Sequence, residues 1–144
     1  MHSTHLSRWK ANHSLVTIIG IILNVSVALP LLIWPDFVLA VLHIPPTDSL
    51  VMTRFAGGLL IILSVFYTPM VYDIDRYRIL AWFQIIPSRT FGTFFFLGAV
   101  VIKGAPAGFL VATLIDGTIA ILALLCLIRI ASLEQKIMNG QADS

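Results

Sequence analysis

The chain has 144 residues, of which 58% are hydrophobic and only 11% are charged, and its mean hydropathy is +0.96. A water-soluble domain of this size needs more polar surface, and a disordered chain needs far less apolar content, so the composition indicates a membrane protein. The net charge of +2 includes no basic run, so we expect no nucleic-acid partner. Because Cys126 is the single cysteine, an internal disulfide and a thiolate-rich metal site are excluded, and we expect neither a metal nor a cofactor.

Four apolar stretches are long enough to cross the ~30 Å hydrocarbon layer, which takes about 20 helical residues. We predict membrane-spanning helices over residues 15–34, 51–72, 79–102 and 109–128. The first stretch contains Asn24 and Pro30 and no small-residue cleavage site follows it, so we predict a retained helix. Unpaired backbone groups are too costly in lipid, and four segments cannot close a barrel, so all four spans must be helical.

The connections between the spans are short, which favours an all-α, up-down bundle of four transmembrane helices. In the longer first loop, Asp36 is a suitable N-cap and residues 37–42 are apolar, so we predict a short interfacial helix there. This helix is either an ordinary connection or a lid over a substrate site. We expect a cytoplasmic segment over residues 1–14, one membrane domain over 15–131 and a cytoplasmic tail over 132–144.

Basic residues are unevenly distributed between the two ends of the predicted bundle. Six lie on the side of the chain termini, whereas Lys103 lies at the opposite edge. Since short cytoplasmic loops carry the excess of Lys and Arg, both termini are predicted to be cytoplasmic. Asp73 and Asp75 precede the third span and are expected to cap its first turn. The six basic residues are Arg8, Lys10, Arg76, Arg78, Arg129 and Lys136.

Three ionisable residues fall within the apolar spans, where an unpaired charge is expensive. Arg89 is expected near the midplane, and Arg54 and Asp116 are expected in the outer half. Because arginine stays charged inside proteins, we predict a salt bridge between Arg89 and Asp116. Asn24 lies at a similar depth and can complete a polar layer, whereas Gln84 is expected to lie outside it, toward the cytoplasm.

This predicted polar cluster has two interpretations. It is either a structural clamp that fixes helix register, or the polar floor of an outward-facing cavity for a quinone, lipid or isoprenoid. Pro87 is expected to kink the third span beside Arg89, which would give the cluster room. The candidate ligand-binding residues are Arg54, Arg89, Asp116 and Asn24, and the candidate catalytic residues are Asp116 and Arg89.

Several short motifs occur in the same order along the four spans. They are Arg-x-x-Gly-Gly at 54–58, Tyr-x-Pro at 67–69, Asp-x-x-Arg-Tyr-Arg at 73–78, Ala-Trp at 81–82, Arg-x-x-Gly at 89–92 and Asp-Gly at 116–117. Together they resemble small four-helix bacterial inner-membrane proteins of the DoxX-like kind, over most of residues 15–128. The resemblance implies an accessory subunit of a membrane redox system, such as quinone-linked sulfur oxidation or an oxidative-stress complex. It gives Arg54, Arg89 and Asp116 as the constrained polar positions.

The leading functional hypothesis is an accessory membrane subunit that meets a hydrophobic small molecule, a partner membrane protein or a second copy of the chain. The alternative is a membrane enzyme that acts on an isoprenoid or polycyclic substrate. In that case Asp116 would be the acid or base, and Arg89 would hold a substrate oxygen. A transporter protomer is a third hypothesis, which would need an oligomer to form a pore.

Overall fold

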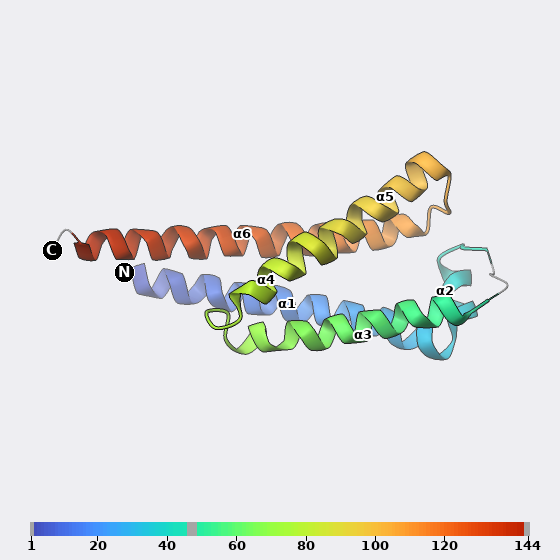
Figure 1. The fold of residues 1–144 in the computed structure, drawn as a ribbon, viewed down its shortest axis with the longest axis horizontal. Helices are drawn as coiled ribbons and strands as arrows, with labels where there is room; N and C mark the ends of the chain where they lie inside the picture. Colours follow the sequence, from blue (N-terminus) through green and yellow to red (C-terminus); the bar gives the residue numbers. More distant parts are fainter. Residues whose placement is uncertain (1, 46–48, 143–144) are drawn as a thin grey trace.

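The computed structural model describes residues 2–45 and 49–142, and all its regular structure within that part is helical. Predictions that fall on Met1, on residues 46–48 of the first loop and on 143–144 of the tail lie outside the described residues. The predicted all-α bundle, with a short helix between its first two spans, is confirmed (Figure 1). Its elements are α1 (His2–Ile33), α2 (Pro35–Val41), α3 (Val51–Tyr72), α4 (Arg78–Phe83), the π-helical segment η1 (Gln84–Thr90), α5 (Phe91–Lys103) and α6 (Phe109–Ala142).

Within the described residues, four helices are long and apolar enough to cross a membrane. The chain is therefore a small integral membrane protein. Both chain ends lie at one end of the bundle, here called the terminal end, and α2 and the α5–α6 connection lie at the opposite, loop end (Figure 1). α1 and α6 have 32 and 34 residues, or about 50 Å each at 1.5 Å per residue, and so exceed the hydrocarbon layer. The domain boundaries at 14/15 and 131/132 stay predictions.

The short helix α2 begins two residues earlier than expected. Its N-cap is Trp34, not Asp36, and Pro35 is its first residue, because a proline at the first helical position lacks only an N–H that would be unpaired anyway. Asp36 lies in the first turn, where its negative charge faces the positive end of the helix dipole. Leu42, which follows α2, lies against the α5–α6 connection. A Cβ on Gly108 in that connection would overlap the carbonyl of Leu42.

The helices are packed unevenly. α1 packs against α3 and α6, and the third span, made of α4, η1 and α5, packs mainly against α6. α3 contacts α4 but makes few contacts with α5, which diverges from it toward the loop end (Figure 1). None of the 13 residues of α5 is buried, and the helix ends at Gly104, whose φ of 66° closes it in the left-handed conformation.

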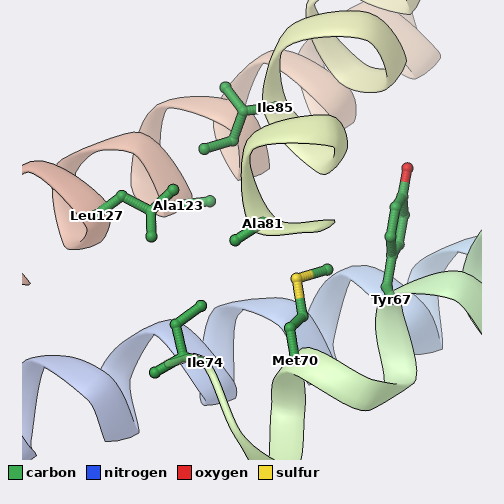
Figure 2. Packing of buried hydrophobic residues seen from close by; sticks show 7 residues of the cluster. All are labelled: Tyr67, Met70, Ile74, Ala81, Ile85, Ala123 and Leu127. Carbon is green, nitrogen blue, oxygen red and sulfur yellow. The ribbon is translucent and has the colours of Figure 1, made fainter. Parts of the chain in front are cut away.

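A buried apolar cluster holds the terminal half of the bundle together. Figure 2 shows its side chains, which come from α3, the following turn, α4, η1 and α6; most of them face the space between these helices, and Tyr67 stands at the edge of the group. Small alanines at two positions let the helices approach closely, and a methionine fills the space between them. The seven residues are Tyr67, Met70, Ile74, Ala81, Ile85, Ala123 and Leu127.

Candidate functional site: a buried ion pair beside a lateral cleft

A π-helical segment positions the central arginine. η1 contains Pro87, which has no N–H to donate and whose ring would collide with the carbonyl four residues earlier in a regular α-helix. The wider i→i+5 turn accommodates this change, and the predicted distortion at Pro87 therefore takes the form of a π-helix. In an α-helix, side chains five residues apart would differ by about 140°, but in η1 both Gln84 and Arg89 are buried.

The predicted ion pair between Arg89 and Asp116 is present. Nη1 of Arg89 donates to Oδ1 of Asp116 over 2.7 Å, which joins η1 to α6. The arginine side chain is 2% exposed and the carboxylate is 25% exposed. A guanidinium this deep needs an acidic neighbour, because the cost of removing it from water is several kcal/mol without one.

Glycines on two helices, α1 and α5, make room for this pair. A Cβ on Gly92 would lie 3.0 Å from Oδ2 of Asp116, and one on Gly20 would lie 2.7 Å from Nη2 of Arg89. Gly117 faces the side chain of Thr93 across the α5–α6 contact, at ordinary packing distance. Gly92 and Gly117 belong to the quoted motifs, whereas the position of Gly20 on α1 was not foreseen.

The remaining nitrogens of Arg89 are less well satisfied. Nε and Nη2 are buried and have no hydrogen-bonding partner among the described residues. The guanidinium carbon lies 5.9 Å from the ring centroid of Tyr67, within reach of a cation–π attraction. The positive charge of Arg89 is therefore balanced by the carboxylate of Asp116 and by the ring of Tyr67.

One face of α1 contributes further polar side chains to the interior. His13, Thr17 and Asn24 are all buried, at intervals of four and seven residues that place them on one helix face. The hydroxyl of Thr17 lies 3.5 Å from Oε1 of Gln84. Gln84, which we expected outside the polar layer, is thus fully buried and part of the polar interior, because its side chain is directed toward Thr17 of α1.

The other two candidate residues are not linked to the ion pair. Asn24 is buried at 8% exposure, but no hydrogen bond among the described residues joins it to Arg89 or Asp116. Arg54 is exposed near the start of α3 and forms no ion pair within the described part of the chain. A ligand-binding role for these four residues stays a prediction, as does the outward-facing cavity.

A cleft of about 540 Å³ lies on the side of the bundle, between α3 and the α4–η1–α5 span. At its floor, the hydroxyl of Tyr67 donates to the hydroxyl of Ser88 over 2.5 Å. Its rim includes Phe66 and Phe91, which are 59% and 65% exposed, so the cleft opens sideways. This pair was not predicted from the sequence, although Tyr67 belongs to the Tyr-x-Pro motif. The eight lining residues are Leu63, Phe66, Tyr67, Leu80, Phe83, Pro87, Ser88 and Phe91.

An ionic network closes the terminal end. Asp75 pairs with Lys10 at 2.6 Å and with Arg78 at 3.0 Å, and Glu134 accepts two hydrogen bonds of 2.8 Å from Arg78. The hydrogen bond from Lys10, followed by that from Arg78, lowers the pKa of Asp75 below its ordinary value. The prediction that Asp73 and Asp75 cap the first turn of the third span is wrong, because α4 begins at Arg78 and has no side-chain cap. Asp73 accepts from the backbone N–H groups of Asp75 and Arg76 within the preceding turn, and Asp75 ties α1 to α4.

No group of three His, Cys, Asp or Glu side chains in the described part of the chain is arranged to hold a metal ion. Comparison of the whole chain with protein-family models, with characterised proteins and with solved structures gives no significant match. The resemblance to DoxX-like proteins therefore depends only on the residues quoted for it.

Proposed function

We propose that this membrane protein is an accessory subunit of a membrane redox or lipid-related system, and that it binds a hydrophobic small molecule such as a quinone or isoprenoid in the lateral cleft. The cleft is the observation that carries the proposal. Its volume of about 540 Å³ falls within the range of small-molecule sites, and its lining is aromatic and aliphatic except for one hydroxyl pair. A ligand that diffuses within the bilayer can enter such a cleft sideways.

The alternative, an enzyme that acts on an isoprenoid or polycyclic substrate, requires Asp116 to contact the substrate. Asp116 is not among the residues that line the cleft, and one of its oxygens accepts from Arg89 at 2.7 Å. A carboxylate engaged in this way is poorly placed to exchange a proton with a molecule in the cleft. The clamp interpretation of the ion pair therefore agrees better with a binding subunit than with an enzyme.

The proposed location is the inner membrane of a bacterium, with both termini in the cytoplasm. The six basic residues named above support this orientation, since they belong to α1, the α3–α4 turn, α4 and α6 near the terminal end, whereas Lys103 ends α5 at the loop end. The bacterial source depends on the DoxX-like resemblance alone. A partner protein or a second copy of the chain remains part of the proposal.

The test is purification in mild detergent followed by native mass spectrometry of bound lipids and co-purifying proteins. Leu63→Trp fills the cleft, whereas Ile62→Trp adds the same bulk on the neighbouring, exposed position outside it. We expect the wild type and the Ile62 variant to retain a hydrophobic ligand, and the Leu63 variant to lose most of it. Thermal unfolding of the two variants controls for folding. Equal retention by both variants, or none by the wild type, would contradict the proposal.

A further inference from the structure

The floor of the cleft offers one hydrogen-bond donor that the protein itself does not use. Tyr67 and Ser88 have two hydroxyl protons between them, and the 2.5 Å contact uses one of them. Among the described residues, the hydroxyl of Ser88 donates to no acceptor. Because a hydroxyl that accepts a hydrogen bond becomes a better donor, the pair is suited to bind one oxygen atom.

The cleft offers no charge to a ligand. None of its eight lining residues is ionisable at neutral pH, and Ser88 is the only one besides Tyr67 with a polar side chain. Arg89 follows Ser88 in the chain, and its guanidinium carbon lies 5.9 Å from the ring centroid of Tyr67. Arg89 is not among the lining residues, however, and its charge is balanced by Asp116, so the lining supplies no uncompensated positive charge. A phosphate or carboxylate at the floor would thus be buried without a counter-charge, at a cost of several kcal/mol.

The walls of the cleft are hydrocarbon. Phe66, Phe83 and Phe91 form its rim, and Leu63, Leu80 and Pro87 complete the apolar lining. Rigid rings and branched side chains of this kind pack well against flat or methyl-branched molecules, since such ligands lose little conformational freedom on binding.

We propose that the Tyr67–Ser88 pair is a head-group site that binds one hydrogen-bond-accepting oxygen of an uncharged lipid and discriminates against anionic phospholipids. This inference rests on the proposed function of the cleft. A quinone carbonyl and an isoprenoid alcohol both carry such an oxygen, so each satisfies the same donor. The Tyr67–Ser88 pair determines which kind of ligand binds, whereas the aromatic walls supply most of the binding free energy.

The experiment measures the Kd values of decylubiquinone, farnesol and dioleoylphosphatidylglycerol for the detergent-solubilised full chain. Tyr67→Phe and Ser88→Ala each leave one hydroxyl at the floor, whereas the double variant leaves none. We expect each single change to weaken binding of the neutral probes by no more than about threefold, and the double change to weaken it about tenfold. Binding of the anionic lipid should be weak throughout and unaffected by the double change.

A matched double variant, Thr68→Val with Ser132→Ala, removes two hydroxyls that bond to the carbonyls of Ser64 and Ile128, outside the cleft. It should bind all probes as the wild type does. Wild-type affinity in the Tyr67→Phe/Ser88→Ala variant, or equal affinity for the anionic lipid, would overturn the head-group site while leaving the cleft as a binding site. Binding of no probe by the wild type would overturn both proposals. Better binding of decylubiquinone or of farnesol identifies which oxygen, carbonyl or hydroxyl, fits the site.

Discussion

The terminal and loop halves of this bundle are held together by different means. In the terminal half, the apolar cluster draws side chains from most of the spans, and the network of Lys10, Asp75, Arg78 and Glu134 joins α1, α4 and α6. In the loop half, α5 buries no residue and separates from α3 (Figure 1). The lateral cleft lies where the closely packed half gives way to the open one.

This difference indicates which interactions hold the helices of a small bundle together in lipid. Lipid tails are as apolar as leucine side chains, so helices gain little from apolar burial alone and need close packing or polar contacts. The terminal half has both, including the hydroxyl of Ser14, which donates to the carbonyl of Val71 at 2.7 Å. Between α3 and α5 there is neither, and the span made of α4, η1 and α5 is fixed mainly by α6.

The largest expected effect concerns the ion pair, which anchors η1 to α6 between the two halves. Asp116→Leu leaves the buried Arg89 without a carboxylate and should lower the free energy of unfolding by about 3–5 kcal/mol. The double variant Arg89→Leu/Asp116→Leu removes both charges and should recover most of that loss. Denaturant unfolding in detergent measures both. A single variant as stable as the wild type would show that packing alone anchors η1.

A smaller effect is expected at the contact between α1 and α3, which continues into the loop half. A Cβ on Gly57 would lie 2.9 Å from the carbonyl oxygen of Ala28, so Gly57→Ala should destabilise the fold by about 1–3 kcal/mol. Gly58 has open space at the same position, and Gly58→Ala should be neutral or slightly stabilising. Thermal unfolding compares the two. Equal effects of the two substitutions would mean that α1 and α3 are not closely packed in the loop half.

The smallest effect is expected from the network at the terminal end, where the charges are partly exposed. Because the pKa of Asp75 in the folded protein lies below its ordinary value of 3.8, its contribution is complete above that pH and is lost as the pH falls through the lowered pKa. Its size is below about 1 kcal/mol, since solvent and salt screen such pairs. Unfolding measured between pH 6 and pH 3 should show a shallower loss of stability in Asp75→Asn. An unchanged pH profile in Asp75→Asn would show that the network does not stabilise the terminal half.

The sequence predicted the four spans, the short helix after the first of them and the pairing of Arg89 with Asp116. These features follow from hydropathy, length and the cost of an isolated charge in lipid, which are properties of single residues. It did not predict the inward position of Gln84, the approach of Gly20 to Arg89 or the pairing of Tyr67 with Ser88. Each of these contacts depends on how one helix is rotated against another, and the π-helical turn changes that rotation without leaving a trace in hydropathy.

The π-helical segment also holds one residue more than an α-helix would need to join the same two buried positions. Deleting one residue between Gln84 and Arg89 would leave them four residues apart, and side chains four residues apart share one face of an α-helix. A shorter, regular α-helix would therefore still direct both side chains into the interior. The extra residue accommodates Pro87 without changing which side chain meets Asp116, and a one-residue gap here in a related protein would indicate a regular helix around the same interior.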